Sequence, residues 1–461
     1  MINNPTTKDI QELLSDIENL SCYKNHVILP DLHLKDKMEA PSSTAISTGE
    51  HIVPSLASAA INDGMSVIKL PFRKEEINEE IIKDFFSEIN SHASAHKLSM
   101  NKYSLTKNEL LDVCLNGANA VLGKYRLAPD IINSMENSGR LNNDLTEDDI
   151  LRLVPNALLS SKFSRAEFGL NFRGNHFLEI QSVEELIKED YLTKFNIKKG
   201  DLTVMTHLGP GPFTGNLMRL YTNRNKISLP HRVLYFLAKT YFHLIESKRK
   251  DLKFSEIIKL FFNPDKYQAF SLDTTLGSDF YKLLQIGTNY GYAYQLGTFA
   301  AIKDAAELIQ NKYSLTKGKT ELIWNVSHNS IYFENCDGVE QFVTRHNSVR
   351  ITENMPTILA GSFDVPSCIG ICDKLHKNDL MNTHDHGIGS IIERIKKEEK
   401  FKTTNQISKR YFYKRGTKTL TEVKECQVSD FGLIKDVSNH FSSLDVFSPW
   451  FYVTPIATLK N

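Results

Sequence analysis

Five histidines lie in short segments whose residue types could carry chemistry. They are His33, His176, His207, His328 and His386, and no two of their segments are neighbours in the sequence. Imidazole is the commonest protein ligand for divalent transition metals, so a fold that gathers these segments would form a metal site. Taken alone, each histidine is more often a core or surface residue with a satisfied hydrogen bond. The prediction therefore depends on the elements that position them.

Hydrophobic patterning predicts a mixture of strands and helices in no strict alternation. The expected strands are 27–29, 66–70, 177–180, 202–206, 321–326 and 450–454. The expected helices are 8–20, 75–95, 107–122, 147–154, 183–195, 231–248, 283–311 and 391–401. Strands that are distant in sequence, with helices between them, indicate an α+β fold. No good linker interrupts the chain, which predicts one large domain over 27–461 with helical insertions, after a helical extension over 1–26.

Composition limits the function classes. The 461 residues carry 55 Lys and Arg against 55 Asp and Glu, so the net charge of zero gives no overall attraction to nucleic acid or anionic lipid. Any polyanion would have to be held by a local patch. The chain has no apolar run of about 18 residues and no signal-peptide pattern, so we expect no membrane association. Its six cysteines include no Cys-x-x-Cys pair, which favours reduced thiols in the cytoplasm.

The stretch 394–418 combines basic and aromatic residues. Ten Lys and Arg alternate there with Phe401, Tyr411, Phe412 and Tyr413. Cations that meet phosphates and rings that stack on bases suit a single strand of RNA or DNA. Glu398 and Glu399 within the stretch and Glu393 just before it dilute the charge, and a solvated helix followed by an edge strand explains the pattern equally well. Both interpretations remain open on the sequence alone.

Taken in order, the histidine segments and their neighbours resemble the RtcB family. Its members are GTP- and manganese-dependent RNA ligases that join a 3′-phosphate or 2′,3′-cyclic phosphate end to a 5′-hydroxyl end. The closest match is Gly-Asn-His-Phe-Leu-Glu at 174–179. Weaker matches follow the family's order at 31–33, 52–54, 60–65, 206–209, 327–329, 360–367, 386–389, 435–437 and 455–461. The resemblance implies an RtcB-like fold with a central cleft for metal and nucleotide.

The resemblance implies a manganese site. Family members hold two Mn²⁺ ions with an Asp, a bridging Cys and three His, and the matching histidines here are His176, His207 and His328. The bridging cysteine position holds Asp63, and manganese accepts oxygen ligands readily. The other acidic position holds Ala60, which cannot bind a metal. One ion held by Asp63, His207 and His328 is therefore expected. A second ion would need His176 with a shared Asp63, or a substitute ligand among Asp31, His33 and Asn62.

The resemblance also implies a covalent nucleotide site. His386 occupies the position of the family's nucleophile, which attacks the α-phosphate of GTP and forms a histidine–GMP intermediate. His384, two residues earlier, would share a face with it on an extended strand, where it could bond the same phosphate or be solvated. Six further residues occupy positions that the family uses for GTP: Asn175, Phe177, Glu179, Ser362, Ser367 and Lys460. Glu179 could accept hydrogen bonds from a guanine edge.

Several family cations are replaced. The arginine of the loop after His207 is absent, and the one after His-Gly-x-Gly is Ser390. Phosphoryl transfer depends on such charges, which Lys35, Arg345 or the 394–418 stretch would have to supply.

Three functions remain to be distinguished. The first is a GTP- and Mn²⁺-dependent RNA ligase that acts on RNA ends, as a monomer, with room for an archease-like helper protein. The second is a divergent paralogue that has lost ligation and acts as a metal-dependent phosphohydrolase or as an RNA-end or nucleotide-binding protein. The third is a non-enzymatic scaffold, which no feature of the sequence favours.

Overall fold

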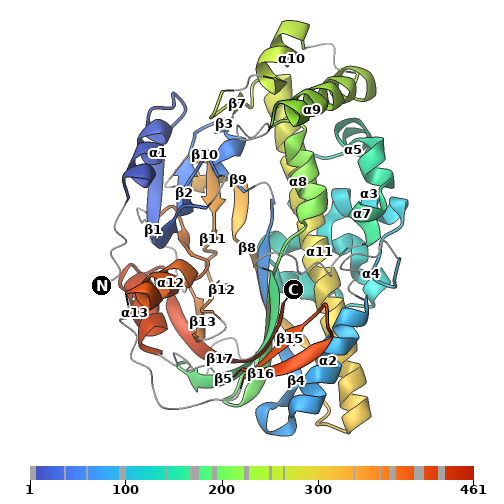
Figure 1. Cartoon of the computed structure of the whole chain (residues 1–461), viewed down its shortest axis with the longest axis vertical. Helices are drawn as coiled ribbons and strands as arrows, with labels where there is room; N and C mark the ends of the chain where they lie inside the picture. The colour runs from blue at the N-terminus through green and yellow to red at the C-terminus, as the bar shows by residue number, and fades with distance from the viewer. Residues whose placement is uncertain are drawn as a thin grey trace.

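The fold is built around one large twisted β-sheet. The computed structural model describes residues 7–35, 38–58, 61–92, 100–141, 144–166, 168, 176–188, 195–222, 228–248, 252–262, 265–336, 338–362, 365–372, 380–398, 410–423 and 431–460. The main path of the sheet has the order β12-β13-β17-β5-β6-β4-β8, and the β15–β16 hairpin joins it through β17 (Figure 1). These strands are β4 Gly64–Arg73, β5 Phe177–Leu186, β6 Asp201–Leu208, β8 Glu321–Ser327, β12 Pro356–Leu359, β13 Ser367–Ile371, β15 Arg410–Lys414, β16 Thr419–Val423 and β17 Ser448–Lys460.

Smaller sheets lie beside the main one. A four-stranded sheet has the order β1-β2-β10-β9, and two-stranded sheets pair β11 with β14 and β3 with β7. The strands are β1 Asn25–His33, β2 Ser42–Ser47, β3 His51–Ile52, β7 Phe270–Ser271, β9 Asn329–Cys336, β10 Val339–His346, β11 Ser348–Arg350 and β14 Thr383–Asp385. Only His328 separates β8 of the main sheet from β9 of the smaller one, so this turn links the two sheets.

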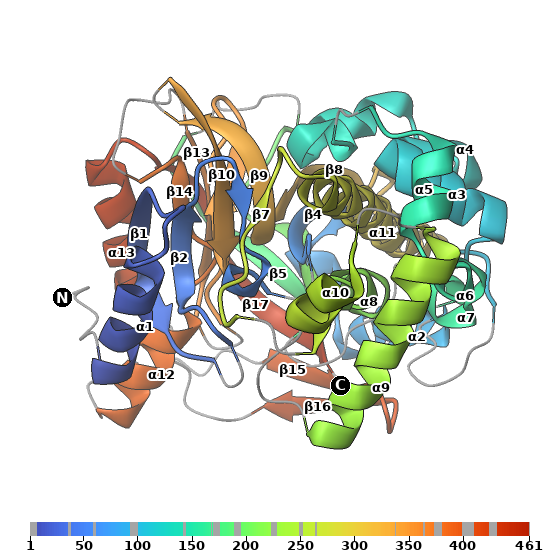
Figure 2. The ribbon, with the colours of Figure 1, turned by 90° about the horizontal axis from the view of Figure 1, so that it is seen from above.

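The helices gather mainly on one side of the sheet (Figure 2). Their bounds are α1 Lys8–Glu18, α2 Glu79–His92, α3 Lys107–Asn116, α4 Leu122–Tyr125, α5 Glu147–Leu153, α6 Asn156–Ser160, α7 Lys162–Ala166, α8 Gly211–Arg219, α9 Leu229–Tyr241, α10 Phe254–Phe261, α11 Thr275–Tyr313, α12 Gly389–Lys397 and α13 Phe431–Ser443. The 39-residue α11 lies against β4 and supports α2, α3, α5 and α8. A single apolar cluster joins this layer to the sheet.

Helix α11 is buried along most of its length, including polar residues that an ordinary core would exclude. Gln285, Thr288, Asn289, Gln295 and Thr298 are all buried. Buried polar groups need hydrogen-bond partners. Asn289 donates to the carbonyl of Cys114, and Gln295 donates to that of Leu208 (2.6 Å) at the end of β6. The helix therefore fixes loops as well as filling the core.

The α+β prediction is confirmed, and every expected strand lies within an observed one. The predicted helix over 183–195 is wrong over its first part, because residues 183–186 continue β5. Val183 pairs with Val453 and Leu186 with Phe451 across β17. The apolar residues there have helical spacing, but they pair with a strand more than 260 residues away in the sequence. Local propensity carries no information about so distant a partner. Residues 189–194 lie outside the described part of the chain.

The expected N-terminal helix is α1, and it packs on the body of the protein. Ile10 and Leu14 contact Leu32 of β1, while Ile17 joins a cluster with Ile46 and Val53. The division at residue 26 stays a prediction. Within the ranges the structure describes, no helix is both long and apolar enough to cross a bilayer.

Candidate active site

One edge of the main sheet collects the predicted metal ligands. The neighbouring strands β5, β6, β4 and β8 are antiparallel, so the start of one lies beside the end of the next. His176 immediately precedes β5, His207 is near the end of β6, Asp63 immediately precedes β4, and His328 immediately follows β8. Phe177 pairs with His207 in register. Four segments that are distant in sequence therefore place their side chains at one edge.

The turn that carries Asp63 is held by helix α11 and by β9. Asn62 has a left-handed backbone with φ of 62°, which asparagine tolerates better than most residues. Its backbone N–H donates to the carbonyl of Asn329 (2.8 Å), and its side-chain amide donates to that of Thr288 (2.9 Å). Gly291 of α11 leaves room for this amide, because a Cβ there would lie 2.6 Å from it. The Asn62 amide is therefore occupied in positioning Asp63.

Four of the five histidines lie next to one another in one group, namely His176, His207, His328 and His386. The ring centroids of His207 and His328 lie 4.7 Å apart, and those of His328 and His386 lie 4.8 Å apart. His176 lies 5.6 Å from His207, and its Nε2 lies 3.9 Å from Oδ2 of Asp63. The side-chain amide of Asn329 donates to Nδ1 of His328 (3.1 Å) and orients that ring.

Several polar atoms of this group are buried without a hydrogen-bond partner. They are Oδ1 of Asp63, Nδ1 of His176, Nε2 of His207, Nε2 of His328 and Nδ1 of His386. Such orphaned atoms are costly in a folded protein and indicate a missing ligand or ion. Oxygen and imidazole donors suit manganese. Within the described ranges, however, no set of three or more His, Cys, Asp or Glu side chains stands in finished metal-ligand geometry. The donor side chains lie at one edge of the sheet without forming such a set.

The electrostatics of the group favour neutral imidazoles. Burial lowers the pKa of His207 well below its usual value, and the neighbouring His176 and His386 lower it further. The pKa of His328 is lowered well below its usual value by the same causes, burial first and then His207. Only neutral imidazole can bind a metal or act as a nucleophile. The site therefore keeps His207 and His328 in the reactive form.

His386 follows β14 and is partly buried. Burial is the main cause that lowers its pKa to about 3, and the nearby Lys35 ammonium adds to the shift. Its carbonyl accepts from the N–H of Ala360 (3.0 Å), which ties the segment to the strand β12. The pKa of Lys35 is itself lowered by burial, while Asp63 and Asp31 oppose the change. Lys35 is thus the cation that the structure places beside both Asp63 and His386.

His384 does not accompany His386 into the site. It is buried among Phe441 and Phe447, Nδ1 donates to the carbonyl of Asp385 (2.5 Å), and Nε2 hydrogen-bonds to Thr357 Oγ1. The expectation that it bonds the phosphate or is solvated is wrong. One strand residue lies between the two histidines, but the segment leaves β14 after Asp385, so the shared face is lost.

Asp31 and His33 have structural roles that the sequence did not reveal. The Asp31 carboxylate accepts from the backbone N–H groups of Ser390 (2.9 Å) and Ile391 (3.0 Å), at the start of α12. A carboxylate at a helix N-terminus meets unpaired N–H groups and the positive end of the helix dipole. Nδ1 of His33 donates to the Asp31 carbonyl (2.6 Å). Asp31 is therefore occupied by α12 and is not a free substitute ligand.

The predicted nucleotide residues are brought together only in part. Phe177 lies with its ring edge-on to His207, at 5.5 Å between centroids. The Glu179 carboxylate is buried and accepts from Gln181 Nε2 (2.8 Å) and Thr458 Oγ1 (2.7 Å). Ser367 Oγ accepts from the N–H of Gly361. Asn175 and Ala60 lie outside the described residues, and the GTP-binding roles stay predictions.

Lys460 and Ser362 lie on elements near the group. Lys460 is the last residue of β17, and its charge contributes to lowering the pKa of His207. The backbone of Ser362 forms a reciprocal pair of hydrogen bonds with Val365. This pair lies just before β13, which begins at Ser367. Lys460 and Ser362 are thus both positioned by backbone pairing.

Two of the expected compensating cations are engaged elsewhere. Arg345 is fully buried, and it donates to Thr383 Oγ1 (2.9 Å) and the carbonyl of Met381 (2.9 Å) and pairs with Glu334. In the 394–418 stretch, α12 is followed by the strand β15, in which Arg410 and Tyr413 are buried. The described part of this stretch therefore forms a helix and a strand, but β15 is not the expected edge strand, because it pairs with both β16 and β17. Residues 399–409 lie outside the described part of the chain.

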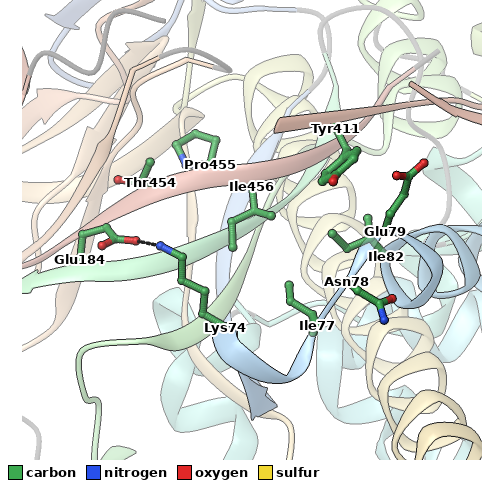
Figure 3. A pocket seen from close by; sticks show the side chains of 10 residues that line it. All are labelled: Lys74, Ile77, Asn78, Glu79, Ile82, Glu184, Tyr411, Thr454, Pro455 and Ile456. Atoms are coloured by element: carbon green, nitrogen blue, oxygen red, sulfur yellow. Dashed lines mark hydrogen bonds and ion pairs between the residues drawn. The ribbon is translucent and has the colours of Figure 1, made fainter. Parts of the chain in front are cut away.

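A separate pocket lies on another part of the sheet (Figure 3). Its volume is about 280 Å³, and Tyr411, Ile456 and Ile82 supply apolar walls. Lys74 and Glu184 form an ion pair (2.5 Å) along one side. Glu184 lies seven positions along β5 from Phe177, which is about 23 Å on an extended strand. This pocket is therefore distinct from the histidine group.

Sequence reasoning missed what positions the site. The role of α11 and the opening that Gly209 leaves for Asp63 became visible only in the fold, since both depend on contacts between distant segments. A usable signal was present nonetheless. His176, Asp63, His207 and His328 each flank a predicted strand, as residues at one edge of an antiparallel sheet must.

Comparison with known proteins agrees with this arrangement. The family model for tRNA-splicing ligase RtcB matches residues 14–461. A tRNA-splicing ligase RtcB of Methanococcus maripaludis is 23% identical over 410 residues, covering 84% of this chain and 78% of the relative. Those of Archaeoglobus fulgidus and Thermococcus kodakarensis are 22% and 20% identical, covering 82% and 90% of this chain and 74% and 83% of the relatives. Because the family model spans nearly the whole chain, this protein belongs to the RtcB family.

Proposed function

We propose that the protein is an RNA ligase of the RtcB type, which joins a 3′-phosphate or 2′,3′-cyclic phosphate end to a 5′-hydroxyl end with GTP and Mn²⁺. The observation that carries the proposal is the contact of His386 with the metal-type histidines, at 4.8 Å between its ring centroid and that of His328. A nucleophile must lie beside the group that holds the phosphate it attacks. Family membership supports the ligase class.

In the proposed reaction an unprotonated ring nitrogen of His386 attacks the α-phosphorus of GTP. A nitrogen–phosphorus bond forms, and the bond to the bridging oxygen breaks to release pyrophosphate. An oxygen of the RNA 3′-phosphate then attacks the same phosphorus and frees His386. Finally the 5′-hydroxyl oxygen attacks the activated 3′-phosphorus, loses its proton, and displaces GMP. The lowered pKa of His386, about 3, keeps the ring unprotonated at neutral pH.

Asp63, His207 and His328 would hold a manganese ion, with His176 beside Asp63. Their orphaned buried donors support this assignment. When bound, the metal would neutralise and orient phosphate oxygens. Lys35 would add positive charge where family arginines are replaced, because it lies close enough to His386 and Asp63 to affect the pKa values of the site.

The test is incubation with GTP labelled at the α-phosphate and with Mn²⁺. We expect a covalent label on the wild-type chain that hydroxylamine or acid removes, as a phosphoramidate requires. His386→Gln should abolish the label, while His231→Ala, at an exposed position on α9, should retain it. Absence of label on the folded wild-type chain, or a label that survives His386→Gln, would overturn the proposal.

A second function is favoured by one observation. Arg345 is enclosed and paired with Glu334, so it cannot supply the charge that the missing family arginines would give. A divergent paralogue that binds metal but no longer ligates would fit such a loss. This alternative predicts bound metal and hydrolysis of phosphate esters without covalent GMP. Ligation of RNA ends by the purified chain would exclude it.

A further inference from the structure

Helix α9 lies at the outer edge of the molecule (Figure 2). Together with the π-helical turn η7 (Phe242–Glu246) that continues it, this helix carries an exposed aliphatic ridge. Six side chains on this ridge are between 40% and 63% exposed: Leu229, Val233, Leu234, Leu237, Tyr241 and Ile245. Most are spaced by four residues, so they follow one face of the helix. Single exposed leucines are ordinary, but a continuous row is typical of an interaction surface.

The same helix buries polar side chains on its inner face. Lys239 is buried, and its ammonium donates to the carbonyl of Thr222 (2.5 Å) and lies 5.4 Å from the ring centroid of Phe261. His243 is fully buried, and Nε2 bonds to the carbonyl of Leu220 (3.0 Å). A helix that only covered a core would place its leucines inward and its lysine outward. This helix buries Phe242 as such a helix would, but it also buries Lys239 and leaves its leucines exposed, so the outward leucines are not used by the fold.

The segment around the ridge is strongly basic in a chain with no net charge. Residues 219–253 contain nine Lys and Arg against two Asp and Glu. Among the described residues, Arg219 at the end of α8 is exposed, as are Lys248 and Lys253, which follow η7 in the chain. The local charge would attract an anionic surface, although the whole chain would not.

We propose that this ridge is a peripheral docking surface for an anionic phospholipid bilayer, in which the α9 leucines enter the interface and the flanking cations meet lipid phosphates. A convex helix with an apolar face and basic residues suits the plane of a membrane interface. Such a helix can bind a flat surface, because its partner needs no groove to receive it. The binding is independent of the ligase chemistry and of the histidine group.

Other occupants fit the same observations less well. A second copy paired about a two-fold axis would bring two basic segments together, and like charges repel. RNA would be attracted by the cations, but it is bound by stacking on aromatic rings, and the ridge is mainly aliphatic. An anionic lipid surface matches both the basic charge and the apolar character of the ridge.

The experiment is flotation of the full chain with vesicles of phosphatidylcholine alone, or of equal parts phosphatidylcholine and phosphatidylserine. We expect the wild type to float only with the anionic vesicles and less at high salt. Leu237→Glu should reduce the bound fraction about tenfold or more, since one leucine leaves the bilayer and a charge enters. Val339→Glu, at an equally exposed position on β10, should have no effect. Lys248→Glu should weaken only the salt-sensitive part.

Three results would overturn the proposal. The wild type could fail to float with either vesicle, or Leu237→Glu could float as the wild type does. The third result is a dimer by light scattering that Leu237→Glu makes monomeric, without flotation, which would assign the ridge to a second copy. Because both leucine and valine positions are exposed, the variants should fold, and circular dichroism checks this.

Discussion

Gly209 lies so close to Asp63 that a Cβ atom at residue 209 would sit 1.2 Å from the Asp63 Oδ1 atom. The carboxylate thus occupies the space that any other residue at 209 would fill. The loop after His207 lacks the family's arginine but keeps this glycine, which gives Asp63 its place among the histidines. A substitution at Gly209 would therefore act on the site without changing any of the proposed metal ligands.

Gly209→Ala should displace the Asp63 carboxylate and weaken Mn²⁺ binding about 10–100-fold, as loss of a supporting contact does at other metal sites. Isothermal titration with Mn²⁺ measures this. Gly211→Ala is the matched control, because a Cβ there meets no atom within 4 Å. Equal affinities for the two variants would show that Asp63 is not a ligand.

Asp63→Cys tests the oxygen-for-sulfur replacement. A thiolate is softer than a carboxylate, so the variant should shift the preference of the site from Mn²⁺ toward Zn²⁺ on the order of tenfold. Competition between the two ions, read by metal analysis after dialysis, gives the ratio. Asp63→Ala should lose both ions, and an unchanged ratio in Asp63→Cys would place the metal elsewhere.

The buried His384 predicts a pH dependence of stability. Burial lowers its pKa to about 4 in the folded chain, against about 6.5 when unfolded. Below pH 6.5, His384 is therefore protonated in the unfolded chain but not in the folded chain. The free energy of unfolding consequently decreases as the pH falls toward 4. This residue contributes up to about 1.4 kcal/mol per pH unit in that window.

Urea unfolding of the metal-free protein between pH 7 and pH 5 measures the effect. The free energy of unfolding should decrease less steeply with falling pH in His384→Gln than in the wild type, whatever its value at pH 7. His207, His328 and His386, whose pKa values are also lowered, add to the slope in the same direction. Parallel curves for the two proteins would exclude His384 as a contributor.

Asp31→Ala should lower the free energy of unfolding by about 2–4 kcal/mol, because the N–H groups of Ser390 and Ile391 would lose a buried charged acceptor. Asp31→Asn keeps one acceptor oxygen and should cost less. Hydrogen exchange should show faster opening of α12 in the alanine variant. An Asp130→Ala control, at an exposed position, should leave stability unchanged, and a similar result at Asp31 would contradict the capping role.

Local patterns predicted much of the fold, and they failed where distant segments meet. Each expected strand exists because its apolar alternation is local, whereas residues 183–186 read as helical until β17 pairs with them. His384 and His386 look alike in sequence, yet one turns into the core and the other into the site. Asp31 looked like a ligand beside His33, but its partner Ser390 lies 359 positions away. Contacts between such distant residues produce no periodic pattern in the sequence.

The place of β17 has a consequence for how the chain is made. This strand lies between β13 and β5 and carries Lys460, so the main sheet has a gap at that position until residue 460 has left the ribosome. During translation β5 would expose an unpaired edge while the residues between 186 and 448 are synthesised, and β13 while those between 371 and 448 are synthesised. Unpaired edges of this kind invite aggregation. Nascent chains stalled before residue 448 should therefore depend on chaperones and show no affinity for metal.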